Sequence, residues 1–67
     1  MDILINAKPY RVEDNCNLVE ALNKVCIVNR FGIAVAVNNI VIPKSEWEKY
    51  PVQHKDNILI INAIFGG

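Results

Sequence analysis

The chain has 67 residues, of which 52% are hydrophobic, and its seven basic and seven acidic residues cancel. A chain of this length makes one domain, residues 1–67, that buries roughly 60% of its extended surface. The charges form no basic stripe, which argues against nucleic acid as a partner. The longest apolar run, residues 33–37, is too short to span a membrane.

Cysteine and histidine are too few for a metal site, because two cysteines without a Cys-x-x-Cys pair and one histidine do not complete a zinc ligand set. Cys16, in a polar stretch, and His54, in a charged loop, receive no catalytic role. Nothing indicates a disulfide framework, so we expect reduced thiols in a cytosol-like compartment. The sequence opens on a strand pattern, and we expect no signal peptide.

The chain begins with a predicted hairpin. Residues 2–6 have strand composition, with Ile3 and Ile5 on one face and Leu4 on the other. A turn at residues 6–8 leads to a return strand, residues 9–12. Because proline donates no ladder hydrogen bond, Pro9 assigns this strand to a sheet edge.

A helix of about eleven residues follows. Asn17 is its predicted N-cap, and Glu20 completes a capping box. One apolar face arises from spacings of three or four residues and contains Leu18, Ala21, Leu22, Val25 and Val28. Asn29 or Gly32 can supply the left-handed residue that ends the helix.

A second hairpin is predicted at residues 33–42. Its first strand, residues 33–38, alternates large branched residues with Ala34 and Ala36. Asn38-Asn39 suits a tight turn because asparagine tolerates positive φ. The second strand, residues 40–42, stops at Pro43.

The chain closes with a helical turn and a strand. Residues 45–47 fit one helical turn, and we expect Trp47 to cover the core. A polar loop ends at Lys55-Asp56-Asn57, where Asn57 can adopt left-handed angles. Residues 58–65 then form an almost wholly apolar last strand.

This order of elements predicts an α+β fold of the ubiquitin-like β-grasp type. A mixed sheet of about five strands, in the order 2-1-5-3-4, packs on one main helix, with the first and last strands central. A ferredoxin-like arrangement is the alternative, but it requires a second long helix that residues 45–50 are too short to form.

One sheet face is expected to remain bare, because one helix covers only the other. Leu59, Ile61, Ala34 and Ala36 would lie on this bare face. An exposed apolar patch of this kind usually marks a partner surface. The alternative is that residues 43–50 fold over it.

Gly66-Gly67 directly follows the last strand. Glycine has no Cβ, so residues 64–67 are expected to form a flexible tail that can pass through a narrow channel. The reactive group of this tail is the α-carboxylate of Gly67. A merely frayed terminus is the alternative interpretation.

The residues now described resemble the sulfur carrier (ThiS) family of thiamin biosynthesis. The resemblance covers residues 18–67 and rests on Val35-Ala36-Val37-Asn38, Val41-Ile42-Pro43, Trp47, Asp56 and the final Gly66-Gly67. The chain departs from the family pattern in lacking a glycine beside Asp56 and in carrying a bulky Phe65 before the glycines.

The resemblance implies a carrier without catalysis or a bound cofactor of its own. An E1-like adenylyltransferase would use ATP to adenylate the Gly67 carboxylate. A sulfur-transfer enzyme and its sulfur donor would convert the adenylate to a thiocarboxylate, which thiazole synthase would consume. Gly66 and Phe65 would present the tail to these enzymes.

Two other functions remain open from the sequence. The small subunit of molybdopterin synthase, or another ubiquitin-like sulfur carrier, shares fold, tail and thiocarboxylate. A ubiquitin-like binding module would lack tail chemistry altogether. The compartment expected for a sulfur carrier is the bacterial cytoplasm, or the stroma of a plastid that encodes its own copy.

Overall fold

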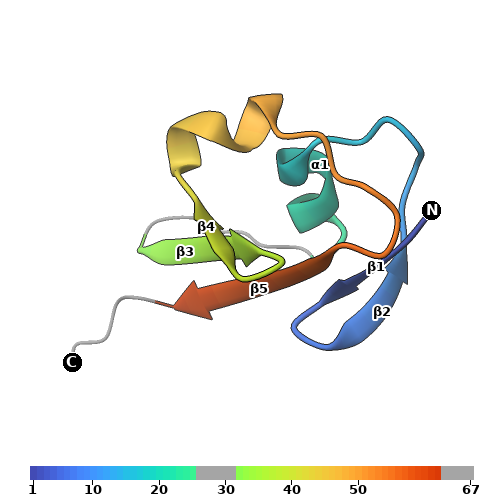
Figure 1. The fold of residues 1–67 in the computed structure, drawn as a ribbon, viewed down its shortest axis with the longest axis horizontal. Coiled ribbons are helices and arrows are strands. Elements are labelled where there is room, and N and C mark those ends of the chain that lie inside the picture. The colour runs from blue at the N-terminus through green and yellow to red at the C-terminus, as the bar shows by residue number, and fades with distance from the viewer. Residues whose placement is uncertain (26–31, 63–67) are drawn as a thin grey trace.

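The structure is a computed structural model that describes residues 1–25 and 32–62. Its strands and helices follow one another as in Figure 1. They are β1 (Asp2–Ile5), β2 (Lys8–Arg11), α1 (Leu18–Asn23), β3 (Ile33–Val37), β4 (Ile40–Ile42), the 3₁₀ helix η1 (Lys44–Lys49) and β5 (Asn57–Asn62). Neither of these helices is long and apolar enough to cross a membrane, within the described ranges.

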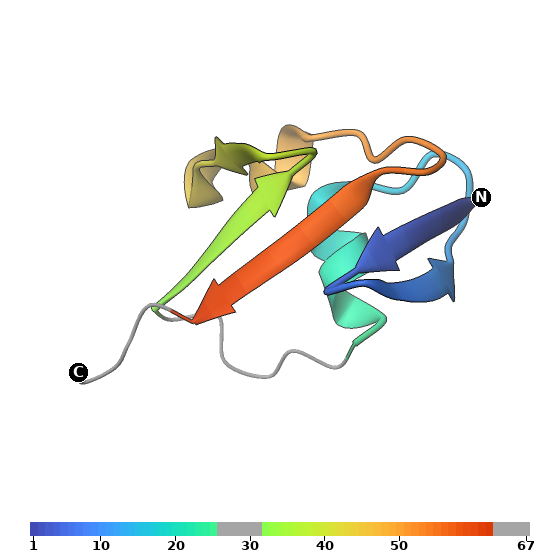
Figure 2. The same ribbon diagram turned by 60° about the horizontal axis from the view of Figure 1, so that its bottom comes forward.

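The five strands form one mixed sheet in the order β2-β1-β5-β3-β4. β1 and β5 run parallel, whereas the other three neighbouring pairs are antiparallel. α1 lies across one face of this sheet. Figure 2 shows β5 running through the middle of the sheet. This arrangement is the ubiquitin-like β-grasp, and it confirms the predicted fold and strand order.

Both hairpins turn through two residues with positive φ. Asn6 and Ala7 have φ of 51° and 69°, and Asn38 and Asn39 have φ of 52° and 72°. Two-residue turns of this kind match the natural twist of the strands they join. The first turn pairs Ile5 with the residue after Ala7, so β2 begins at Lys8, one residue earlier than predicted.

The predicted capping box is present at the start of α1. The backbone N–H of Glu20 donates to Asn17 Oδ1 at 2.8 Å, and the backbone N–H of Asn17 donates to Glu20 Oε1 at 2.9 Å. These two bonds satisfy amides that the helix itself leaves unpaired.

The helix ends earlier than the apolar spacing predicts. α1 stops at Asn23, and the N–H groups of Lys24 and Val25 bond to carbonyls only three residues back. This tightening is typical of a last turn. Val25 still packs against the core, whereas Val28, Asn29 and Cys26 lie outside the described residues.

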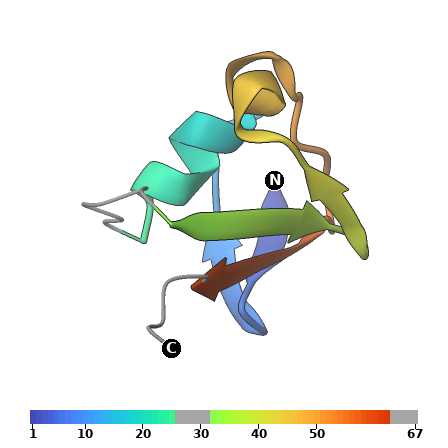
Figure 3. The same cartoon turned by 90° about the vertical axis from the view of Figure 1, so that its left-hand side faces the viewer.

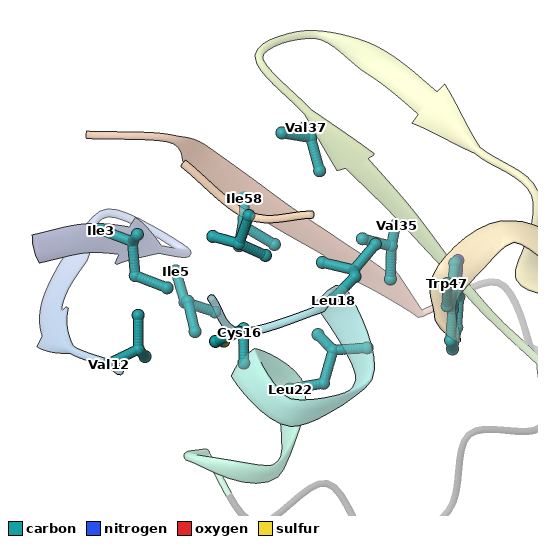
Figure 4. Packing of buried hydrophobic residues seen from close by; sticks show 12 residues of the cluster. Ile3, Ile5, Val12, Cys16, Leu18, Leu22, Val35, Val37, Trp47 and Ile58 are labelled. Atoms are coloured by element: carbon teal, nitrogen blue, oxygen red, sulfur yellow. The ribbon is translucent and has the colours of Figure 1, made fainter. Parts of the chain in front are cut away.

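The core lies between the sheet and α1 (Figure 4). Side chains from both layers point toward one another there, among them Ile3, Ile5, Leu18, Leu22, Val35, Val37 and Ile58. Trp47 covers the end of this cluster, as predicted. It is buried, and its Nε1–H donates to the carbonyl of Ile42 at 2.9 Å, so the polar end of the indole is satisfied.

A buried carboxylate ties the second hairpin to the start of β5. Asp56 is only 8% exposed. Its Oδ1 accepts from Asn38 Nδ2 at 2.9 Å, and its Oδ2 accepts from the N–H of Gln53 at 2.8 Å. Asn38 Oδ1 accepts in turn from the N–H of Asn57 at 2.9 Å.

The expectation that Asn57 adopts left-handed angles is wrong. The left-handed residue of this turn is Lys55, with φ of 69°. Its N–H donates to the carbonyl of Asp2 at 2.6 Å. Asn57 is already the first residue of β5 and pairs with Leu4, which requires an extended backbone.

We expect Asp56→Ala to lower the free energy of unfolding by about 2–3 kcal/mol, because two partly buried hydrogen bonds lose their charged acceptor. Glu13→Ala, which removes an exposed carboxylate, serves as the control and should change it by less than about 0.5 kcal/mol. Urea unfolding of both variants measures the difference. Equal stability of the two would show that the Asp56 bonds contribute nothing net.

Candidate functional site

The sheet face opposite α1 carries a set of apolar side chains, which we call the open face. Figure 3 shows α1 and η1 on the same side of the sheet. In an antiparallel ladder, directly opposed residues point to the same side. Ala34 opposes Ile61, and Ala36 opposes both Leu59 and Val41, so these residues share one face.

The predicted exposure of β5 is confirmed. Leu59 and Ile61 are 47% and 42% exposed, whereas Ile58 between the sheet and α1 is fully buried. The alternative that residues 43–50 fold over the open face is wrong. η1 packs against α1, and its Trp47 belongs to the core cluster on the other side of the sheet.

The prediction that Ala36 is exposed on this face is wrong. It is only 6% exposed, and Ala34 is half-buried. The reason is the size of their neighbours, because the larger Leu59, Ile61 and Val41 stand beside them on the flanking strands. The two alanines therefore lie lower in the open face than the larger side chains around them.

The open face also includes three residues that the sequence did not assign to it, namely Leu4, Pro9 and Val41. Leu4 on β1 is 39% exposed and lies directly opposite Pro9 on β2, and Val41 is exposed on β4. The signal was present in the sequence for Leu4, since it alternates with the buried Ile3 and Ile5. Its place beside β5 required the strand order.

The β1–β2 end of the open face is hollowed and charged. An apolar hollow of about 350 Å³ is lined by Asp2, Ile3, Leu4, Pro9 and Lys55. Arg11 Nε lies 3.1 Å from Asp2 Oδ1 at the sheet edge. The hydrogen bond from Arg11 and its positive charge lower the pKa of the Asp2 carboxyl. The open face thus combines an apolar centre with a charged rim, as protein interfaces do.

The predicted tail residues Phe65, Gly66 and Gly67 lie outside the described residues. The structure does place the start of the tail. β5 ends at Asn62, which pairs with Ile33, and Ile61 of the open face directly precedes it. Five residues follow Asn62 in the sequence, and five extended residues span at most about 17 Å. This reach is the greatest distance that residues 63–67 can add beyond the end of β5.

Catalytic and metal chemistry finds no support in the rest of the described chain. Residues 1–25 and 32–62 contain no group of three or more acidic, cysteine or histidine side chains that could hold a metal ion. Cys16 is buried and donates to the carbonyl of Asn17. Burial and, secondarily, the charge of Glu20 raise the pKa of its thiol, which makes it a poor nucleophile. His54 Nδ1 accepts the N–H of Asp2 at 3.0 Å, a structural contact.

The strand order and the single covering helix define the class of ubiquitin-like β-grasp proteins. Residues 3–67 match the ThiS family, and the chain belongs to that family. It is 39% identical over 67 residues to the sulfur carrier protein ThiS of Escherichia coli K12, and the match covers the whole of both chains.

A solved structure supports the fold independently. The crystal structure of the thiamine biosynthesis protein (ThiS) from Geobacter metallireducens matches with a TM-score of 0.85. The match covers the whole of both chains at 22% identity, so it bears on the architecture.

Because Ile61 and Ile58 lie on opposite faces of β5, replacing each of them by lysine should have opposite effects on stability. Ile61→Lys should change the free energy of unfolding by less than about 1 kcal/mol, because its side chain reaches water. Ile58→Lys places an unpaired charge in the core and should unfold the protein. Circular dichroism with urea titration distinguishes the two. An unfolded Ile61→Lys would mean that the open face is covered in solution.

Proposed function

We propose that this chain is a sulfur carrier of thiamin biosynthesis, a cosubstrate modified at Gly67 and not a catalyst. The observation that carries the proposal is the Gly66-Gly67 pair, which begins four residues after the end of β5 at Asn62, in a member of the ThiS family. Its full-length relative in Escherichia coli is named a sulfur carrier. In this proposal, residues 1–67 act as one β-grasp domain whose residues 64–67 form the presented tail.

The chemistry must begin by activating the Gly67 carboxylate, because a carboxylate is a poor electrophile. An E1-like adenylyltransferase joins it to AMP from ATP, which releases pyrophosphate and leaves a mixed anhydride. A sulfur-transfer enzyme then delivers a sulfide equivalent that displaces AMP and leaves a thiocarboxylate. Thiazole synthase takes up that sulfur for the thiazole ring.

The chain's own contribution is presentation of the reacting carbon. Gly66 and Gly67 carry no side chain, so nothing beside the carbonyl would block a narrow active-site channel. Phe65 would lie at the channel entrance. The described residues need supply no acid or base, which agrees with the lack of an activated cysteine or histidine among them.

The open face is the proposed docking surface for the partner enzymes. It exposes Leu4, Leu59, Ile61 and Val41 on strands that share the sheet with β5, and it ends where the tail begins. A partner that covers these side chains would also hold the start of the tail. The bacterial relative and the buried free thiol of Cys16 support a site of action in the cytoplasm, or in a plastid stroma.

Mass spectrometry after incubation with the activating enzyme, ATP and a sulfur donor tests the carrier function. We expect the native chain to gain the mass of one sulfur in place of one oxygen. Deleting Gly67, or adding one alanine after it, moves the carboxylate by about 3.5 Å. A displacement of even about 1 Å can cost a factor of about 100 in rate, so neither variant should react.

Both length variants leave the core unchanged, so equal thermal stability is the control for this experiment. Reaction of the variants at the native rate would contradict a role for Gly67. A native chain that binds its partners but never gains sulfur would contradict the carrier function. The remaining interpretation would then be a ubiquitin-like binding module without tail chemistry.

A second experiment tests docking. Ile61→Lys should weaken binding to the activating enzyme roughly 10- to 100-fold, because a charge replaces an apolar contact at the end of the open face nearest Gly66-Gly67. Gln53→Lys adds the same charge at an exposed position in the loop before β5 and should bind as the native protein does. Isothermal titration calorimetry measures both, and equal weakening would place docking elsewhere.

A further inference from the structure

The apolar hollow at the β1–β2 end of the open face has the size of a side-chain pocket. Its lining residues are Asp2, Ile3, Leu4, Pro9 and Lys55, and its volume is about 350 Å³. This volume is near the lower limit for ligand pockets, which measure roughly 300–1,000 Å³. The hollow therefore suits one large apolar side chain of another protein better than a cofactor.

The charge at the rim of this hollow is unbalanced. The Asp2 carboxylate is paired with Arg11, whose Nε lies 3.1 Å from Asp2 Oδ1. Lys55 is exposed and forms no ion pair within residues 1–25 and 32–62. A positive charge thus lies beside an apolar hollow, and a carboxylate on another molecule would complement it.

The backbone of Lys55 is held in a conformation that favours glycine. Its φ is 69°, in the left-handed region, where a Cβ is unfavourable. Its N–H donates to the carbonyl of Asp2 at 2.6 Å, which ties the start of its side chain to β1 beside the hollow. Because glycine would form this turn at a lower cost, the turn itself does not explain a lysine here.

The hollow and the last residue of β5 lie at opposite ends of that strand. Leu4 of the hollow pairs with Asn57, where β5 begins, whereas β5 ends at Asn62 (Figure 2). Five steps of about 3.3 Å place these two ends roughly 16 Å apart. A partner that fills the hollow and also contacts Ile61 would hold the sheet at two separated points, which fixes its orientation.

We propose that the hollow is a specificity site for the activating enzyme. It accepts one apolar side chain of that enzyme, and Lys55 pairs with a carboxylate beside that side chain. The inference rests on the proposed sulfur-carrier function, in which the activating enzyme must select this chain before any other step. A protein fits better than a nucleic acid, because one lysine supplies no row of phosphate contacts.

Replacing Lys55 separates its charge from its place in the turn. Lys55→Gly removes the charge and relieves the left-handed backbone, so its melting temperature should be at least that of the native protein. It should nevertheless bind the activating enzyme roughly 2- to 5-fold more weakly, as loss of one exposed ion pair predicts. Lys55→Arg keeps the charge and should bind within about twofold of the native protein.

Charge reversal has a matched control on the other face of the same sheet. Lys55→Glu should weaken binding roughly 5- to 20-fold, because repulsion replaces attraction. Lys8→Glu makes the same change of net charge, but Lys8 opposes the buried Ile5 and so points to the α1 side. Lys8→Glu should bind within about twofold of the native protein, because exposed charges away from the contact are screened.

Association and dissociation rates separate the lysine from the hollow, and surface plasmon resonance with the activating enzyme measures both. Lys55→Glu should associate roughly 3- to 10-fold more slowly at an ionic strength of about 0.01 M, and the difference should shrink at about 0.1 M. Leu4→Ala removes part of the apolar wall and should dissociate roughly 5- to 30-fold faster at both ionic strengths. Circular dichroism checks that Leu4→Ala remains folded.

The rate of thiocarboxylate formation distinguishes this proposal from the carrier function on which it rests. With the activating enzyme, ATP and a sulfur donor, Lys55→Glu should raise KM and leave kcat unchanged, because the hollow contributes binding only. A native chain that never gains sulfur would overturn the carrier function. A native chain that gains sulfur, together with a native KM in Lys55→Glu, would overturn the specificity site alone.

Three further results would each overturn the specificity site. They are an equal loss of affinity in Lys8→Glu, a native dissociation rate in a folded Leu4→Ala, and a lower melting temperature in Lys55→Gly. The last result would show that Lys55 serves the fold and not the partner.

Discussion

The register of β5 is the constraint on which both the core and the candidate site depend. Side chains alternate along a strand, so Ile58 fills the core while Leu59 reaches the open face. A slip of one residue would exchange the two sets completely. Because both sets are apolar, hydrophobicity distinguishes the two registers poorly, and specific polar contacts must select one.

Two asparagines supply such contacts at different points of β5. Asn38 bonds both to the buried Asp56 and to the backbone of Asn57, which fixes the start of the strand against the β3–β4 turn. Asn6 bonds to the backbone of Ile60 on the opposite edge. Each uses a left-handed turn to aim an amide side chain at a neighbouring strand. Turn residues therefore determine which face of β5 is bare.

The sequence predicted what local periodicity encodes and missed what distant contacts decide. The alternation in residues 58–61 predicted both faces of β5, and the capping box at Asn17 predicted the start of α1. The burial of Ala36 depends on larger side chains of two other strands, which no local pattern shows. The left-handed residue is Lys55, because Asn57 is committed to bonds with Asn38, far away in the sequence.

The residues that carry the family resemblance have structural and not chemical roles in the described chain. Pro43 ends β4 and its carbonyl accepts the N–H of Glu46, which starts η1. η1 then returns over α1, and Trp47 enters the core from that side. Had the chain crossed to the other side of the sheet, the indole would cover Leu59 and Ile61. Pro43 and Trp47 thus keep the open face bare without touching it. In the proposed function the chemistry lies at Gly67, which would need no activated side chain, but the partners would need one apolar face left uncovered.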